Sequence, residues 1–156
     1  MKKLPTNIQK LVSANSVELL NGYIRIINSK SINQFLEILK GKDFWESDIP
    51  FATTVFGDVV AWNLDGYIQL YKMTDGISEI VMCGDEFFAQ NIEDSTFQNT
   101  YFDLDLFYNA EKKYGKISPD QCYAFLPIPA LGGKKELNSI EIQPLLPYLT
   151  LLSDTF

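Results

Sequence analysis

The segment from Phe51 to Cys83 constrains the fold most, because strand-like stretches alternate in it with tight-turn sequences. The stretches are rich in β-branched and aromatic residues, which favour strands. Asn63-Leu-Asp-Gly66 and Asp75-Gly76 supply the turns, since glycine accepts the positive φ that a tight hairpin demands. The predicted strands are Phe51–Phe56, Val59–Trp62, Tyr67–Tyr71 and Ile77–Cys83. Together they predict an antiparallel meander of three or four strands.

Segments with helical periodicity lie before and after this meander in the sequence. Ser31 is suited to cap a helix whose apolar residues recur every three or four positions until Gly41 ends it. Asp85 is suited to cap another helix, which carries Phe87, Phe88 and Ile92. The other predicted helices are Pro5–Ala14, Asp103–Tyr114 and Pro144–Leu152, and two further short strands are Gln121–Phe125 and Ser139–Gln143. The fold class we predict is α+β, an antiparallel, meander-containing sheet flanked by helices.

A chain of 156 residues without a repeat or a Gly/Ser linker favours one domain. We expect residues 1–156 to form it, with N-terminal helices over about residues 5–41 and the sheet with its helices over about 50–152. No run of about 18 apolar residues is present, and the amino end lacks an apolar signal stretch. We therefore expect a cytoplasmic protein that does not contact a membrane.

The net charge of −7 is distributed unevenly. Residues 1–42 carry a net charge of +5, whereas residues 43–111 carry fourteen acids against the single base Lys72, a net of −13. An acidic surface repels phosphate and attracts basic partners, which argues against direct nucleic-acid binding. A soluble acidic surface without a partner would have the same composition.

Catalytic signatures are scarce, and the absence of histidine excludes Ser-His-Asp and Cys-His dyads and His-ligated zinc sites. Asp103-Leu-Asp105 resembles a metal-binding pair, but on a helix the two side chains diverge, and both positions favour capping. Gly132-Gly-Lys-Lys135 lacks the spacing of a phosphate loop. Cys83 and Cys122 are interpreted as unpaired small hydrophobes. We expect no catalytic residue, cofactor or metal.

Aromatic residues of the predicted meander leave two interpretations open. Trp62, Tyr67 and Tyr71 would form an exposed patch that anchors a protein partner, or they would pack beneath helices.

Several short motifs occur in the order found in one bacterial family. Phe51–Trp62, Tyr114-Gly115, Cys122–Pro127 and Ala130–Gly133 are the main ones, and Gly22–Ile26 is an early one. Over roughly residues 15–152 the chain resembles the C-terminal domain of type VI secretion DNase immunity proteins, a family associated with a GAD-like domain. The signature residues Phe56, Gly57, Asp58, Trp62, Pro127, Gly132 and Gly133 are interpreted as structural, and the resemblance supplies no catalytic residue.

This resemblance implies a cytoplasmic, antitoxin-like protein that binds and neutralises a polymorphic toxin, commonly a nuclease. An acidic face would suit the basic groove of such a toxin. The acids that we predict to bind the partner are Asp58, Asp65, Glu79, Asp85 and Glu86.

Two alternatives remain. One is a small ligand-binding or carboxylate-based enzyme, which a deep pocket with two facing acids would favour. The other is a regulatory interaction module similar to the SUKH group. The sequence does not identify the toxin, the stoichiometry or any self-association.

Overall fold

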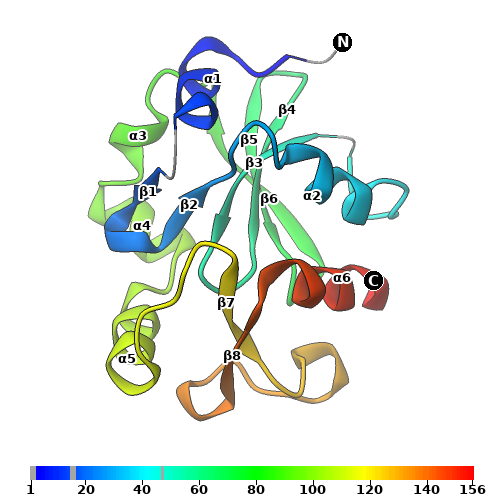
Figure 1. Cartoon of the computed structure of the whole chain (residues 1–156). Helices are drawn as coiled ribbons and strands as arrows, with labels where there is room; N and C mark the ends of the chain where they lie inside the picture. The colour runs from blue at the N-terminus through cyan, green and yellow to red at the C-terminus, as the bar shows by residue number, and fades with distance from the viewer. Residues whose placement is uncertain (1–2, 15–16, 47) are drawn as a thin grey trace.

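The computed structural model describes residues 3–14, 17–46 and 48–156. Eight strands lie within these residues: β1 (Glu18–Leu19), β2 (Ile24–Ile26), β3 (Ile49–Thr54), β4 (Val59–Asn63), β5 (Tyr67–Lys72), β6 (Ile77–Cys83), β7 (Gln121–Phe125) and β8 (Ile140–Pro144). Six α-helices accompany them: α1 (Thr6–Ser13), α2 (Ile32–Leu39), α3 (Phe88–Asn91), α4 (Ser95–Tyr101), α5 (Leu104–Tyr114) and α6 (Leu145–Thr155). The predicted α+β class is confirmed (Figure 1).

Strands β1 to β6 form one antiparallel sheet in sequence order, so the predicted meander is confirmed and extends further toward the amino end. Both hairpin turns form as expected, with Gly66 at φ +98° and Gly76 at φ +66°. The β5–β6 register shifts by one residue between the pairs Ile68–Met82 and Gln69–Ile80. Strand β6 is an edge of this sheet.

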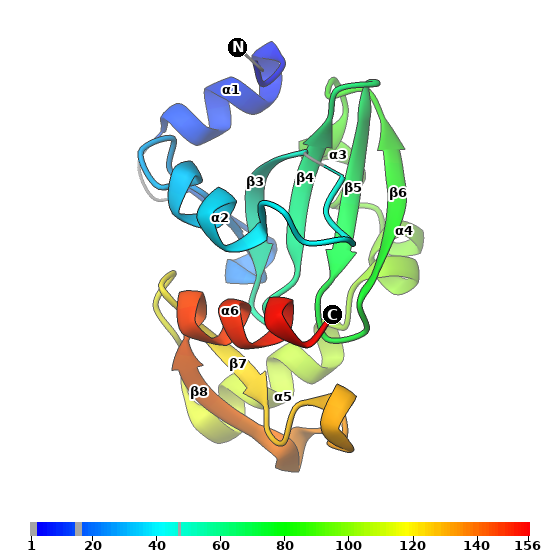
Figure 2. The same ribbon diagram turned by 90° about the vertical axis from the view of Figure 1, so that its right-hand side faces the viewer.

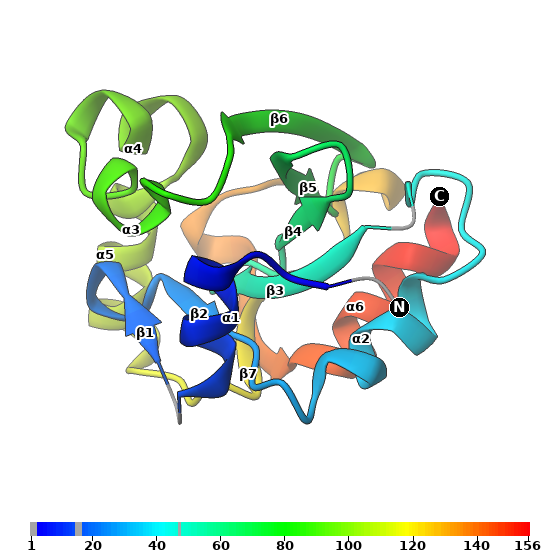
Figure 3. The same cartoon turned by 90° about the horizontal axis from the view of Figure 1, so that it is seen from above.

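Each face of the large sheet is covered by helices, which lie on opposite sides of the strands in Figure 3. Side chains of α1, α3 and α5 join a core on one face that contains Phe51, Ile68 and Leu70. Side chains of α2 and α6 join a second core on the other face, which contains Tyr71. Both faces of β3 to β5 are therefore buried.

The small sheet of β7 and β8 lies at one end of the large sheet (Figure 1). Tyr123 donates its backbone N–H to Val55 O at 2.8 Å, which joins the two sheets. Tyr123 and Phe125 belong to the first core, whereas Cys122 and Ala124 belong to the second. Because side chains alternate along a strand, β7 extends both cores at once.

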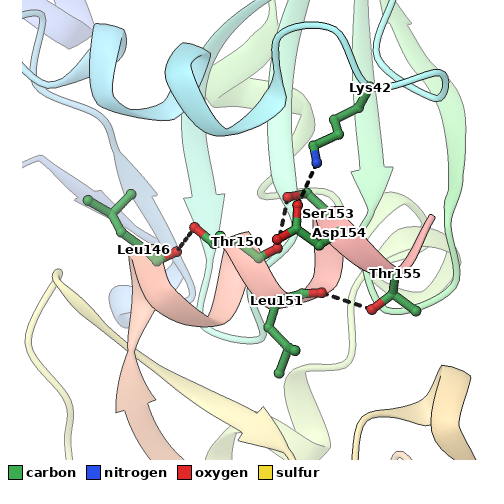
Figure 4. A network of polar contacts seen from close by, with 7 residues as sticks. All are labelled: Lys42, Leu146, Thr150, Leu151, Ser153, Asp154 and Thr155. Atoms are coloured by element: carbon green, nitrogen blue, oxygen red, sulfur yellow. Dashed lines mark hydrogen bonds and ion pairs between the residues drawn. The ribbon is translucent and has the colours of Figure 1, made fainter.

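Helices α2 and α6 lie side by side and run in the same direction (Figure 2). The loop after α2 is tied to the end of α6 by an ion pair between Lys42 and Asp154 (Figure 4). Within α6, Thr150 Oγ1 donates to Leu146 O at 2.9 Å. Of these two contacts, the ion pair connects the last helix to the N-terminal half of the chain, whereas the hydrogen bond lies within α6.

The structure corrects two predictions for single segments. The stretch of about residues 5–41 is not purely helical, because β1 and β2 lie between its helices. Asp85 does not cap the helix that follows it, since α3 begins at Phe88; instead its Oδ2 accepts the N–H of Asn7, in the first turn of α1, at 3.0 Å. Asp85 therefore bonds to a residue distant in the sequence and not to the helix that follows it.

Candidate functional site

The signature residues Phe56 and Gly57 form the turn between β3 and β4, where the two sheets meet. The Phe56 ring stacks on Phe125 at a centroid distance of 5.4 Å. Gly57 has φ +87°, and a Cβ there would lie 3.2 Å from the ring of Tyr148 in α6. Positive φ and this close approach both favour glycine, so the structural interpretation of this pair has a physical basis.

Pro127, Gly132 and Gly133 belong to one loop after β7. The Leu126–Pro127 peptide bond is cis. Gly132 is left-handed with φ +93°, and a Cβ on Gly133 would lie 1.7 Å from Pro127 O. Gly133 N–H donates to Ile128 O at 3.1 Å. The two glycines therefore let the chain fold back onto its own backbone.

The predicted aromatic patch does not form. Tyr71 is buried, and its ring lies 4.5 Å from that of Trp45 in the loop before β3. The Tyr71 hydroxyl donates to Asp48 Oδ2 at 2.8 Å, and Asn63 Nδ2 donates to the other oxygen of Asp48 at 2.8 Å. Trp62 is partly buried against the first core. Tyr67 is also partly buried, so the interpretation in which these aromatics pack inside holds fully for Tyr71 and in part for Trp62 and Tyr67.

Asp58, the first of the five predicted partner-binding acids, points into the protein. Its Oδ1 accepts the N–H of Met73 at 3.2 Å, and it lines a cavity of about 190 Å³ with Lys72 and Lys135. Burial raises the pKa of the Asp58 carboxyl to about 6, and Lys135 opposes this rise. Asp58 is therefore a half-buried, partly desolvated acid in the wall of this cavity.

Asp65, Asp85 and Glu86 are brought together at the opposite end of β4 and β5. Gly84 N–H donates to Gly66 O at 2.8 Å, which holds the β4–β5 turn beside the segment after β6. Asp65 and Glu86 are exposed, and Asp85 is half-buried.

Two exposed apolar side chains, Leu64 at 53% and Phe87 at 56% exposure, occupy the same two segments. The surface of Leu64, Asp65, Asp85, Glu86 and Phe87 is called the acidic end below. Its apolar members were not predicted as part of a surface, because their only signal in the sequence is an apolar residue inside each polar turn segment.

Glu79, the fifth predicted acid, lies on the edge strand β6, beside Lys72 of the Asp58 cavity. Its Oε2 lies 3.4 Å from Lys72 Nζ, so part of its charge is balanced within the chain. The five acids thus occupy three places: the interior, the β6 edge and the acidic end.

The residues that remain to be placed are Asp103 and the two cysteines, which the sequence offered for metal binding or nucleophilic chemistry. Asp103 Oδ1 accepts the N–H of Leu106 at 3.2 Å, so the capping interpretation is confirmed. Cys122 is fully buried, and burial raises the pKa of its thiol to about 12. Cys83 is exposed, and both cysteines are unpaired. Across residues 3–14, 17–46 and 48–156, no group of three or more His, Cys, Asp or Glu could hold a metal ion.

Two larger cavities accompany the one at Asp58. One of about 720 Å³ lies between α1 and α2, and the other, of about 440 Å³, lies at the starts of α2 and α6. Asp58 and Asp103 both line the 190 Å³ cavity, but the Asp103 carboxylate caps its own helix.

In the part of the chain that the structure describes, no helix is long and apolar enough to cross a membrane.

Part of the chain is similar to a known protein family. A family model described as "T6SS immunity protein Tdi1, C-terminal" matches residues 84–155. Residues 84–155, just under half of the chain, are similar to this family. The match confirms the resemblance to type VI secretion immunity proteins and covers β7, the glycine loop and α6. The motifs at Phe51–Trp62 and Gly22–Ile26 lie outside it.

A solved structure supports the fold over nearly the whole chain. It is described as "Crystal structure of Atu4351 from Agrobacterium tumefaciens" and superposes with a TM-score of 0.68. The alignment has 16% sequence identity and covers 94% of this chain and 73% of that one. At this identity the likeness concerns the fold alone. No curated protein matches the chain.

Proposed function

We propose that this chain protects its own cell by binding a toxin of the type VI secretion system and neutralising it directly. The observation that carries the proposal is the immunity-family match over residues 84–155. The large sheet, α1 and α2 lie outside the match, yet α6 packs against α2 and β7 bonds to the β3–β4 turn. We therefore treat the whole chain as one functional domain.

The toxin-binding surface in this proposal is the acidic end. Phe87 and Leu64 supply exposed apolar area of the kind that anchors a protein interface. Asp65, Asp85 and Glu86 surround it with negative charge, which orients a basic partner and speeds its approach. Glu79 extends the charge along β6, whereas Asp58 has an interior role.

The toxin is proposed to be basic and to act on nucleic acid. The net charge of −13 over residues 43–111 supports this, because an acidic protein surface complements the basic groove of a nuclease. The same charge disfavours direct binding of this chain to nucleic acid. Two unpaired cysteines are typical of the reducing cytoplasm, where such a toxin would act.

The test measures affinity for the toxin-like product of the neighbouring gene by titration calorimetry. Replacing Asp65, Asp85 and Glu86 by their amides removes three charges from the acidic end. The matched control, Glu37→Gln with Glu136→Gln and Glu141→Gln, removes three charges from exposed residues elsewhere.

The acidic-end variant should lose at least about tenfold in affinity, because each rim charge contributes a fraction of a kcal/mol to about 1 kcal/mol. The control should lose little, and wild-type affinity should fall as salt rises. Equal losses in the two triple variants would remove the acidic end as the binding surface. No measurable complex with wild type would argue against this toxin as the partner.

A further inference from the structure

A second recognition feature lies far from the acidic end, around Arg25 in β2. Arg25 is the only arginine in the sequence and lies in the apolar run Tyr23-Ile-Arg-Ile-Ile27. It is 3% exposed and lines the 440 Å³ cavity. The cavity opens between β2, the start of α2 and the start of α6.

The guanidinium of Arg25 has few hydrogen-bond partners for a buried cation. Its Nη2 donates to Thr54 O at 3.3 Å, but its Nε has no hydrogen-bond partner among the described residues. Glu18 and Asp120 attract its charge, yet within the described chain neither lies at ion-pair distance. A buried charge without a close counter-charge is costly, so an external anion at this cavity would stabilise Arg25.

Two helix ends reinforce the positive potential at this cavity. Ser31, at the start of α2, and Leu146, in the first turn of α6, both line it. Neither helix has a side-chain cap on its first N–H groups. Figure 2 shows the two helices side by side and beginning on the same side of the molecule. Helix starts carry partial positive charge that favours an anion. This applies more to α2 than to α6, because the Leu145 N–H of α6 already donates to Asp120 O at 2.8 Å and Pro147 has no N–H.

We propose that this cavity binds a carboxylate carried on a short apolar stem, with Arg25 as its principal ligand. The planar guanidinium offers donors in a fork that matches the two oxygens of a carboxylate. Phe35, Leu145 and Leu146 provide apolar wall for the stem, and Asp120 is the one acid in the lining. The carboxylate comes from a free small acid or from an acidic side chain of a partner protein.

The test exploits the single arginine, which gives one Nε–Hε signal in the nitrogen-proton spectrum of the labelled protein. Titration with sodium butanoate should shift this signal saturably, and neutral butanamide should not. Arg25→Met should weaken butanoate binding about tenfold or more, since hydrogen bonds to charged groups contribute about 1.5–3 kcal/mol. Binding to this variant is followed through the backbone signals of Ser31 and Leu146.

Leu146→Trp keeps the arginine but fills the cavity, so it should also abolish the shift and covers the case in which Arg25→Met does not fold. An Arg25 signal unchanged by butanoate in wild type would overturn the proposal, as would equal responses to butanoate and butanamide.

A competition experiment separates the two sources of carboxylate. If saturating butanoate weakens a complex with the toxin, the carboxylate belongs to the partner protein. If the complex is unaffected, the cavity serves a free small acid. This arm alone depends on the proposed immunity function, whereas the titration of the free protein does not.

Discussion

Asp58→Asn should stabilise the protein at neutral pH and have little effect in acid. Burial raises the pKa of Asp58 from 3.8 to about 6, so between these values the folded state binds more protons than the unfolded state. Stability then falls as pH rises through this window. At about 1.4 kcal/mol per pH unit, the ionised carboxylate destabilises the fold by about 3 kcal/mol above about pH 6. Asparagine does not titrate, and its oxygen can still accept from Met73.

The assay is urea denaturation followed by tryptophan fluorescence. The free energy of unfolding of Asp58→Asn minus that of wild type should be about 3 kcal/mol larger at about pH 7.5 than at about pH 3. Asp43→Asn, at an exposed acid, controls for the general effect of removing a charge. A difference independent of pH, or one that grows toward acid, would refute the buried-acid interpretation. Toxin affinity should not change, because Asp58 does not lie at the acidic end.

Two further predictions concern the signature loop and the cysteines. Gly133→Ala should lower the free energy of unfolding by about 3 kcal/mol or more, because its Cβ would overlap Pro127 O. Gly132→Ala should lower it by about 1–2 kcal/mol, since only its φ is unfavourable, and comparable denaturation midpoints for the two variants would contradict this ranking. A thiol reagent should modify Cys83 rapidly and Cys122 only after unfolding, and two fast thiols in the native protein would contradict the burial of Cys122.

Local sequence signals predicted much of the fold. The hairpin turns at Gly66 and Gly76 and the helix that ends before Gly115 depend on backbone preferences that a single segment carries. The missed elements have weaker local signals. Strand β1 has two residues and β2 three, so the pairing of β1 with β2 and of β2 with β3 is decided by tertiary packing.

The candidate site was less predictable because it depends on which distant segments meet. Asp85 has the composition of a helix cap, but it bonds to Asn7, 78 positions away. The acids at Asp58 and Asp65 look alike in sequence, yet β4 separates an interior position from an exposed one. Arg25 stands out in the sequence as a lone charge inside an apolar run, which predicts a costly burial, but the sequence does not show which group would balance its charge.

The central claim, immunity by direct binding, is tested most directly by survival of cells that express the toxin with and without this chain. We predict that wild type restores growth and co-purifies with the toxin, and that the Asp65, Asp85 and Glu86 triple variant restores growth less well than its charge-matched control. Continued killing while wild type is present as a folded protein, with no complex recovered, would contradict the account.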